Sequence, residues 1–549
     1  MLIRLTFVYL KMIMKLKVLL TTSLFISVIT YSQTEIPPTN NSGTFSGSFY
    51  SNTNGFIRDT KIGANTALYT QALSAVEGWF NANYNSSMVN VSLRYDFYHN
   101  SNLLQPNVPY SNNGIGFWQI NKTVDKFDFT IGSIYDQFGS GSIFRAYWEP
   151  FIGIDNAIMG ARVIYKPNTN LTIKAISGKQ KYRFGSFEPI IKGVNAEQSF
   201  SSKNNINTTI GVGLLNRTLD ITTMKGLADN INTYELKDRF VPKYNEFAYQ
   251  GYATTYIKDF TVGLEYAGKT LDVVQNETSS QMINREGQFI QGIISWSHSG
   301  KRGIGVNLQY RKLNNFEFRV SPSENGLTGL VNYLPSITRQ NTYRLMARYN
   351  AVTQFNNEQT IQGDIIYTHN DKNLFQLNAS YVTGINNVTL FREVYADWLH
   401  QYSDQLKLIL GVQSVQFNQA ILQGEPGVAD VFTLTPFTEL NYDISHTRSI
   451  RVEAQFLSTK QDSGSFINFL VDFNIAPHWS FSAGDMVNII PRTGTEKIHF
   501  YTLFAAYTEG ASRVALAYVK QLAGFNCNGG ICRFEPAFNG IKLTLSSTF

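Results

Sequence analysis

The feature that most constrains the fold of this chain is a two-residue alternation of apolar and polar side chains. In residues 467–475 (INFLVDFNI) every odd-numbered position is apolar, whereas Asn468, Asp472 and Asn474 lie on the other face. This period places the two kinds of side chain on opposite faces of a β-strand. The same alternation recurs in VSLRYDF (91–97), FTVGLEYAGK (260–269), IGVNLQYR (304–311), FQLNASY (375–381) and IRVEAQF (450–456).

Composition decides which kind of sheet these strands build. Aromatic residues make up 14% of the chain and charged residues 16%, against about 25% charged residues in ordinary soluble proteins. Strands of roughly 9–11 residues have the length that a tilted strand needs to cross a bilayer. We therefore predict an all-β fold, a single large transmembrane antiparallel β-barrel of about 22–26 strands, with 24 as the central value.

Short turns and longer connections alternate along the chain. We assign the short turns to the periplasmic side and the long loops, near residues 98–114, 220–245, 270–285, 313–340, 418–428 and 524–533, to the extracellular side. The short turns are expected at Asn85-Ser86, Asp125-Lys126, Pro167-Asn168, Lys203-Asn204, Lys258-Asp259, Gly300-Lys301, Asp371-Lys372, Ser403-Asp404, His446-Thr447, Pro477-His478 and Ala511-Ser512.

The first 32 residues read as a cleaved signal peptide whose true start is Met14. Basic residues precede the apolar run VLLTTSLFISVI, and small residues precede Gln33. Residues 33–73 are predicted to lead into the first strand, and residues 74–549 to form the barrel. The segment carries four positive charges, so the formal net charge falls from +6 to +2 without it. A near-neutral chain without long basic runs excludes nucleic acid as the expected partner.

The chain ends on an aromatic residue in an alternating strand. Leu543, Leu545 and Phe549 lie on one face of GIKLTLSSTF. In a closed barrel the last strand must pair with the first, and the terminal aromatic is interpreted as the signal that the outer-membrane insertion machinery reads. The alternative is a chance aromatic terminus. Outer-membrane lipid and the insertion machinery are thus the expected partners, and a Gram-negative outer membrane the expected location.

The whole chain resembles outer-membrane β-barrels of Bacteroidota-type bacteria. The segment FTIGSIYDQFGSGSIFRAYWEPFIGIDNAIMGARVIY (129–165) is similar to a motif of a barrel family of uncharacterised function in that group. The resemblance implies a location and an architecture. It implies no catalytic residues.

That segment also contains the densest polar and aromatic cluster. Gly139 and Gly141 permit unusual backbone angles. The charged and aromatic residues could line a constriction or a ligand contact inside a pore, or form an ion-pair network that holds a loop over the barrel mouth. The candidates are Asp136, Arg145, Trp148, Glu149, Asp155 and Arg162.

Cysteine and tryptophan have simpler interpretations. Cys527 and Cys532 are the only cysteines and are expected to form a disulfide in the last long loop, because a metal site would need further ligands. The tryptophans are expected in interfacial aromatic girdles, although stacking on sugars is the alternative, with Trp148 the best exception. They are Trp79, Trp118, Trp148, Trp296, Trp398 and Trp479.

Charges near one another on the expected lumen face have mixed sign, so a polar lumen without strong ion preference is predicted. A wide barrel also needs a block, for which loops 220–245 and 313–340 are the candidates. The pairs are Arg94 with Asp96, Lys126 with Asp128, Glu265 with Lys269, and Arg451 with Glu453.

Three functions follow, in order of preference. The first is a passive or loop-gated channel for polar solutes. The second is a non-conducting barrel that binds a partner lipoprotein or membrane protein. The third is an outer-membrane enzyme, which the scattered histidines and the lack of a Gly-x-Ser-x-Gly sequence disfavour. No cofactor and no metal is expected.

Overall fold

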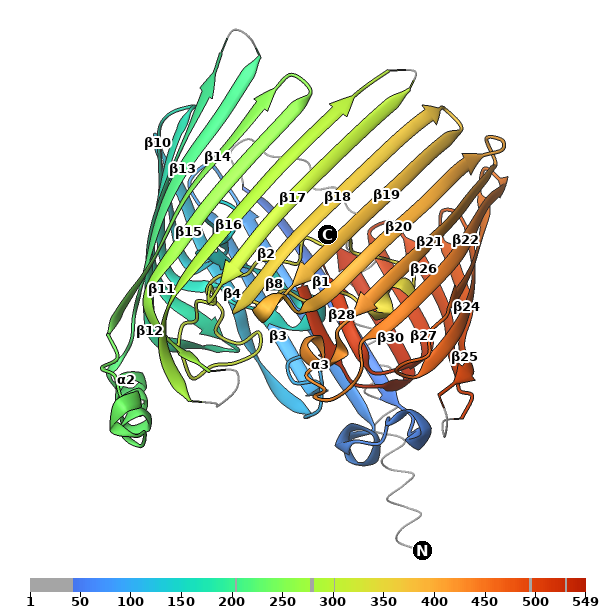
Figure 1. Ribbon diagram of the computed structural model, residues 1–549, viewed down its shortest axis with the longest axis horizontal. Coiled ribbons are helices and arrows are strands. Elements are labelled where there is room, and N and C mark those ends of the chain that lie inside the picture. The colour runs from blue at the N-terminus through green and yellow to red at the C-terminus, as the bar shows by residue number, and fades with distance from the viewer. Residues whose placement is uncertain (1–42, 203–204, 277–280, 301, 493–495, 529–530) are drawn as a thin grey trace, which may run out of the picture.

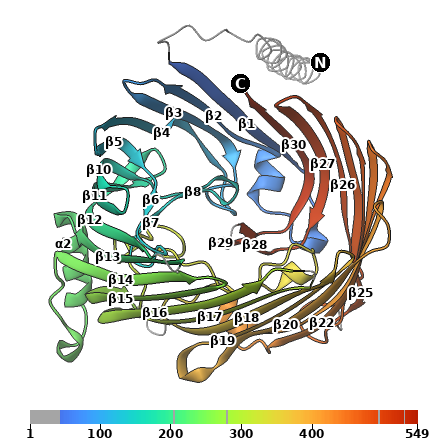
Figure 2. The ribbon, with the colours of Figure 1, turned by 90° about the horizontal axis from the view of Figure 1, so that it is seen from above.

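The computed structural model describes residues 43–202, 205–276, 281–300, 302–492, 496–528 and 531–549. Twenty-four antiparallel strands form one closed sheet (Figures 1 and 2). The predicted fold class and the predicted central strand number are both confirmed. The expected signal peptide, residues 1–32, lies outside the described residues.

The wall strands share an antiparallel register with both neighbours, so no edge of the sheet is left open. They are β1 (Thr44–Phe56), β2 (Ser74–Asn85), β3 (Asn90–Ser101), β4 (Tyr110–Val124), β5 (Phe127–Ile134), β10 (Ile158–Asn168), β11 (Leu171–Tyr182), β12 (Gly185–Ser201), β13 (Ile206–Thr218), β14 (Asn245–Ile257), β15 (Phe260–Gln275), β16 (Met282–His298), β17 (Gly303–Asn314), β18 (Asn357–Asn370), β19 (Asn373–Thr383), β20 (Thr389–Gln401), β21 (Leu406–Phe417), β22 (Val431–Ser445), β23 (Arg448–Leu457), β24 (Gly464–Ile475), β25 (Trp479–Pro491), β26 (His499–Glu509), β27 (Ser512–Gln521) and β30 (Phe538–Thr548).

The barrel closes by pairing of β1 with β30. Tyr50 lies opposite Ser546 in this register, so the last strand pairs with the first as predicted. The prediction that residues 33–73 only lead into the first strand is wrong, because β1 is a wall strand. Gly47 exchanges backbone hydrogen bonds with Phe549 (2.8 and 3.0 Å). A Cβ at Gly47 would lie 2.4 Å from the Phe549 ring, so the close approach requires glycine.

The wall is apolar outside and polar inside. In β22, Phe432 and Leu434 are 53% and 51% exposed, whereas the alternate residues Thr433 and Thr435 are 5% and 0% exposed. In β19, Phe375 and Leu377 are exposed and Asn378 is buried. The apolar face of each strand therefore points away from the protein, the reverse of a soluble sandwich.

The two rims of the barrel differ in the length of their connections. The predicted short turns that lie in the described residues fall at one rim, called here the short-turn rim, which also holds the start of β1 and the end of β30. Lys203-Asn204 and Lys301 lie outside the described residues. Several of these two-residue turns have a residue in the left-handed region, for example Asp125 and Lys258, which fits the twist of paired strands.

Most long connections lie at the opposite rim, called the long-loop rim. This rim also has one short connection, the two-residue turn at Arg183 and Phe184 between β11 and β12. The helices α2 (Ile221–Asn232) and α3 (Gln419–Leu422) are at this rim, with single-turn helices at Thr60–Ile62, Leu68–Ala72, Leu236–Asp238 and Ile385–Asn387. Among the described residues, no helix is both long and apolar enough to cross a membrane.

Three connections of the long-loop rim turn into the lumen (Figure 2). We call residues 135–157 the first insert, residues 315–356 the second insert and residues 522–537 the third insert. The first holds the short strands β6 (Asp136–Gln137), β7 (Arg145–Ala146), β8 (Trp148–Glu149) and β9 (Ile154–Asp155) and the helical turn Pro150–Ile152; the second holds the turn Met346–Arg348; the third holds β28 (Gly524–Asn528) and β29 (Ile531–Glu535).

The predicted lumen-blocking loops are half right. Residues 313–340 enter the lumen with the second insert, but α2 in loop 220–245 lies outside the wall (Figure 2). The apolar face of α2 packs on Leu219 and Val273 rather than on lumen residues. The reason is local: Asp220 caps the helix by accepting hydrogen bonds from the backbone N–H groups of Thr222 and Thr223, which starts the helix directly at the rim.

Candidate functional site

The first insert is fixed to the wall by an ion-pair cluster around Asp155. Its carboxylate lies 2.5 Å from both the Arg94 guanidinium of β3 and the Lys181 ammonium of β11. Tyr135 donates a hydrogen bond to it (2.9 Å). Arg94 also pairs with Asp96 at 2.7 Å. All these side chains are largely buried, so their charges depend on one another for compensation.

A second ion-pair cluster holds the start of the same insert. Asp136 pairs with Arg162 of β10 (2.9 Å) and with Lys174 of β11 (2.7 Å). Arg162 also lies 3.6 Å from Asp128 of β5. The sequence candidates Asp136, Asp155 and Arg162 therefore anchor the insert to the wall, which is the arrangement of the ion-pair-network interpretation.

The other three candidates lie within the insert itself. The Arg94 guanidinium stacks 4.0 Å above the Trp148 ring. The Arg145 guanidinium lies 5.1 Å from the Tyr147 ring. Glu149 pairs with Ile154 in the β8–β9 hairpin. The structure thus brings together Trp148 and Asp155, which pair in the β8–β9 hairpin and both contact Arg94, but it does not assemble all six candidates into one site.

The second insert spans the lumen between opposite parts of the wall. Near its start, the Arg319 carbonyl accepts a hydrogen bond from Arg217 of β13 (2.9 Å). Further along, Arg344 donates to the carbonyls of Phe500 in β26 and Lys520 in β27 (3.3 Å each). Apolar residues near the start pack on β10–β17, and Leu345, Tyr349 and Ala351 pack on the other half of the wall.

One contact of the second insert is a buried anchor at the long-loop rim. Arg348 pairs with Asp462 of the β23–β24 connection at 2.6 Å, and the Tyr349 hydroxyl donates to the same carboxylate at 2.7 Å. Burial alone would raise the pKa of Asp462, but the charge of Arg348 and these hydrogen bonds outweigh it and lower the pKa.

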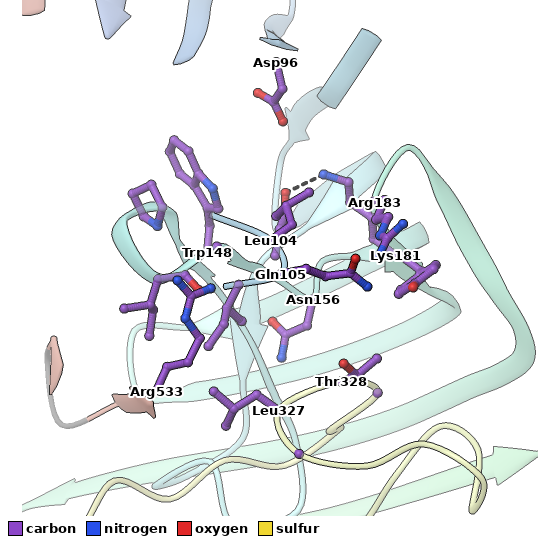
Figure 3. A pocket seen from close by; sticks show the side chains of 18 of the residues that line it. Asp96, Leu104, Gln105, Trp148, Asn156, Lys181, Arg183, Leu327, Thr328 and Arg533 are labelled. Carbon is purple, nitrogen blue, oxygen red and sulfur yellow. Dashed lines mark hydrogen bonds and ion pairs between the residues drawn. The ribbon is translucent and has the colours of Figure 1, made fainter. Parts of the chain in front are cut away.

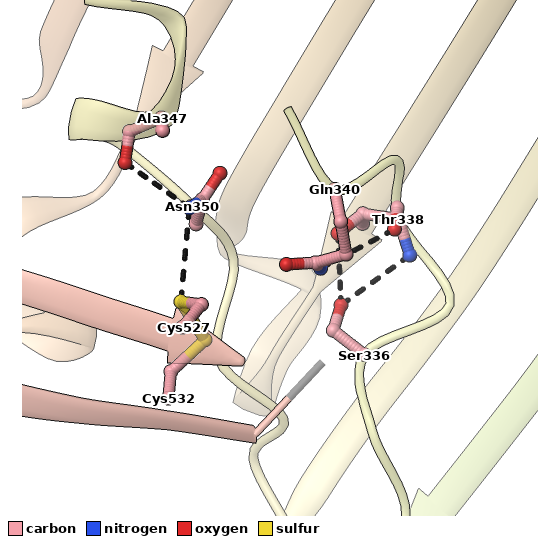
Figure 4. The surroundings of a disulfide bond; sticks show 7 residues. All are labelled: Ser336, Thr338, Gln340, Ala347, Asn350, Cys527 and Cys532. Carbon is pink, nitrogen blue, oxygen red and sulfur yellow. Dashed lines mark hydrogen bonds between the residues drawn. A yellow bond between two sulfur atoms is a disulfide. The ribbon is translucent and has the colours of Figure 1, made fainter. Parts of the chain in front are cut away.

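The third insert is a hairpin closed by the predicted disulfide between Cys527 and Cys532 (Figure 4). Asn350 of the second insert donates to Cys527 Sγ (3.7 Å) and to the Ala347 carbonyl (3.0 Å). Arg533 donates to the Ile152 carbonyl of the first insert (2.8 Å). The hairpin therefore contacts both other inserts.

All three inserts meet in one apolar cluster. Asn332 of the second insert also donates to the Ser142 carbonyl of the first (2.8 Å). The inserts thus hold one another in place, besides being held by the wall. The cluster contains Ile152 and Ile154 of the first insert, Leu330 and Tyr333 of the second, and Ile531 of the third.

A cavity of about 510 Å³ lies where the three inserts face β2, β3, β11 and the β3–β4 connection. Trp148 and Arg533 lie on one side of it and Lys181 and Arg183 on the other, with Gln105 and Asn156 between them (Figure 3). Its lining includes Trp79, Tyr98, Trp148, Tyr182, Phe184, Phe187 and Phe534. This size and aromatic lining are typical of small-molecule sites.

The tryptophans divide between the two faces of the wall. Trp118 and Trp479 are exposed on the outer face. Trp296 stacks with Phe260 (6.1 Å) and Trp398 with Phe375 (6.3 Å), both beside short turns. Trp148 lies inside the barrel, in agreement with its selection as the tryptophan that fits an aromatic girdle least well. Trp79, which the sequence did not separate from the others, is inside too and meets Trp148 edge to face at 5.4 Å.

Two of the four predicted lumen pairs form. Arg94 pairs with Asp96 (2.7 Å), and Arg451 with Glu453 (2.5 Å). The other two predictions are wrong, because nearer partners compete: Asp128 pairs with Arg162, and Lys269 with Asp272 (3.1 Å). Glu265 instead accepts a hydrogen bond from Ser142 of the first insert (2.5 Å).

Several histidines in the described part of the chain contact acidic or amide side chains. Among the described residues no histidine forms a hydrogen bond with a serine, and His499, for example, contacts Asp485. No group of three or more His, Cys, Asp or Glu side chains there could hold a metal ion.

The protein is thus a closed β-barrel whose lumen holds three inserts that contact one another. The chain belongs to the family described as a family of unknown function (DUF6029), which matches residues 14–549. No curated protein matches the sequence.

Solved structures with a similar fold include several large barrels. The P pilus usher (PapC) translocation pore is 9% identical, with 92% of this chain and 99% of that chain covered and a TM-score of 0.45. The siderophore receptor PirA from Pseudomonas aeruginosa is 6% identical (93% and 81% covered, TM-score 0.41). The ferric-catecholate import receptor Fiu from E. coli K12 is 10% identical (93% and 82% covered, TM-score 0.37).

Proposed function

We propose that this protein is an integral outer-membrane barrel that acts as a loop-gated channel for polar solutes, with the three inserts as its gate. The observation that carries the proposal is the second insert, which crosses the lumen yet is fixed at the long-loop rim by a compact polar anchor, Arg348 with Asp462 and Tyr349. Displacing an insert held in this way would open the wide bore beneath it.

Polar side chains on the inner wall support passage of polar solutes. Below the inserts, toward the short-turn rim, the lumen face carries uncharged, partly exposed groups such as Asn81, Gln119 and Asn441. Such groups can exchange hydrogen bonds with a hydrated solute without selecting strongly for one sign of charge.

The outer face supports the proposed location. Its exposed apolar residues would meet acyl chains, and the aromatic residues beside the short turns would sit at one interface. In the same proposal the signal peptide directs export, the short-turn rim is periplasmic, and Leu543, Leu545 and Phe549 are read by the insertion machinery.

The Arg348–Asp462 anchor gives a direct test of gating. Asp462→Asn removes the charge but suits the left-handed backbone of this position (φ 48°). We expect its open probability in planar bilayers to rise about tenfold, the factor that corresponds to about 1.4 kcal/mol.

The same anchor predicts a pH dependence. Because the folded pKa of Asp462 is below the unfolded value of about 3.9, the ionised carboxylate stabilises the anchor at neutral pH, and this contribution is lost as the pH falls through the folded pKa. Wild-type protein should therefore keep the anchor at pH 5 and behave like the variant only once the pH falls below the folded pKa, which lies under the unfolded value of about 3.9.

The matched control is Asp430→Asn, at the same rim, where the carboxylate accepts a hydrogen bond from Gln416 (3.0 Å) and forms no ion pair with a described residue. It should leave the open probability unchanged. A protein that stays silent with Asp462→Asn and at acid pH would contradict gating by this anchor.

A second candidate function is a platform for a partner protein, and one observation favours it. Ile221, Leu236 and Val241, around α2, are 78%, 83% and 85% exposed outside the barrel mouth. An electrically silent protein that copurifies with one partner, and loses it when these three residues are changed to serine, would support the platform.

A further inference from the structure

We propose that the cavity between the inserts and the wall binds an aromatic organic acid that carries a hydroxyl group. The inference goes beyond the proposed channel function, because binding in this cavity can be measured whether or not the barrel conducts. It rests on three properties of the lining: an aromatic surface, one cation without a carboxylate partner, and one buried acceptor without a donor.

The aromatic surface sets the shape of the ligand. Phe184, Phe187 and Phe534 line the cavity together with Trp148. One face of Trp148 is already covered by the Arg94 guanidinium, which is 4.0 Å from the ring. A volume of about 510 Å³ accepts one or two rings, and offset or edge contacts with the lining would favour a planar apolar body.

Most charges of the lining are already compensated. Arg94 and Lys181 share Asp155, and Arg94 also holds Asp96. Arg533 is paired with Glu535. The two lining carboxylates therefore offer little attraction to a cationic ligand, and these three cations offer little to an anionic one.

Arg183 differs from these three cations because no carboxylate in the described part of the chain compensates its charge. It lines the cavity from the β11–β12 turn, and its guanidinium lies 4.8 Å from the Tyr110 ring and 5.1 Å from the Tyr182 ring. Among the described residues no carboxylate lies within ion-pair distance of it. Its planar donors can bind a carboxylate in bidentate fashion, and the two rings restrict its position beforehand.

Gln180 supplies the second polar contact. Its Nε2 donates to the Leu330 carbonyl (2.6 Å), but its Oε1 has no hydrogen-bond partner although the residue is only 1% exposed. A buried acceptor without a donor is costly. A ligand hydroxyl would satisfy it, so the ligand class combines a ring, a carboxylate and a hydroxyl group.

The test uses 4-hydroxybenzoate as the probe and 4-hydroxybenzamide, of the same shape but neutral, as its counterpart. Binding to the purified full-length protein in detergent is measured by titration calorimetry. We expect saturable binding of the acid at least about tenfold tighter than that of the amide, since a hydrogen-bonded charge pair is the stronger contact.

Arg183→Asn is expected to weaken acid binding about tenfold and to leave amide binding unchanged, whereas Arg183→Lys retains part of the acid preference. Asparagine suits the positive φ of this turn residue (55°), so the barrel should fold. Arg392→Asn, on an exposed site of β20, is the matched control and should change nothing.

Three results would overturn the proposal: no saturable binding of 4-hydroxybenzoate, equal affinity for the amide, or an unchanged acid affinity in Arg183→Asn. Heat-modifiable migration of each variant on a gel verifies that it is folded. Because no current is recorded, a negative result here leaves the channel proposal untouched, and a silent barrel leaves the binding proposal untouched.

Discussion

Replacing residues 317–354 with a four-residue Gly-Ser turn is expected to raise the conductance of the barrel by at least about tenfold, because a 24-stranded wall encloses a wide bore once its contents are removed. The ends of the second insert are already adjacent: Phe316 N–H donates to the Phe355 carbonyl (2.9 Å). A short turn can therefore join β17 to β18 without disturbing the wall. Single-channel recording in planar bilayers measures the effect.

The matched control removes a loop of the same rim that stays outside the lumen. Replacing residues 222–240, which include most of α2, by a Gly-Ser linker should leave the current unchanged, since α2 packs on the outer rim. If both deletions raise the current equally, the second insert is not the main obstruction.

Asp155→Asn should destabilise the protein by about 3–5 kcal/mol, the usual effect of removing one member of a buried ion pair. Asp155 is the ion-pair partner of Lys181 and one of the two ion-pair partners of Arg94. We expect the free energy of unfolding in urea to fall and protease cleavage in the first insert to increase.

Two further variants separate charge compensation from general damage. Glu188→Gln breaks the exposed pair with Lys179 (2.7 Å) on the same hairpin and should cost less than about 0.5 kcal/mol. Adding Lys181→Met to Asp155→Asn removes the uncompensated cation and should restore part of the lost stability. A full loss that Lys181→Met does not relieve would contradict the charge argument.

The wall could be predicted because one physical rule acts at nearly every position of it. A strand between an apolar exterior and a polar lumen must alternate, as residues 467–475 do. β1 was missed because TFSGSFYSNTNGF is rich in serine, asparagine and glycine and alternates weakly. Its place is fixed by pairing with β2 and β30, which sequence periodicity does not contain.

The contents of the lumen were harder to predict, since their partners are distant in sequence. The charged residues of the first insert could be recognised in the sequence. That Asp155 pairs with Arg94 and Lys181 could not be predicted from it. In the second insert, Arg344 and Arg348 were missed, although they are the only charged residues in residues 340–356, which is a usable signal. Their acceptors lie on β26, β27 and the β23–β24 connection, and no local pattern connects these elements.

The division of the wall into an apolar exterior and an insert-filled interior is tested most directly by quenching of tryptophan fluorescence with brominated lipids. Variants that retain only one tryptophan are reconstituted into vesicles of brominated phosphatidylcholine. Trp118 and Trp479, on the outer face, should be strongly quenched, whereas Trp148, inside among the inserts, should keep its fluorescence. Strong quenching of Trp148, or none of Trp118 and Trp479, would contradict the account.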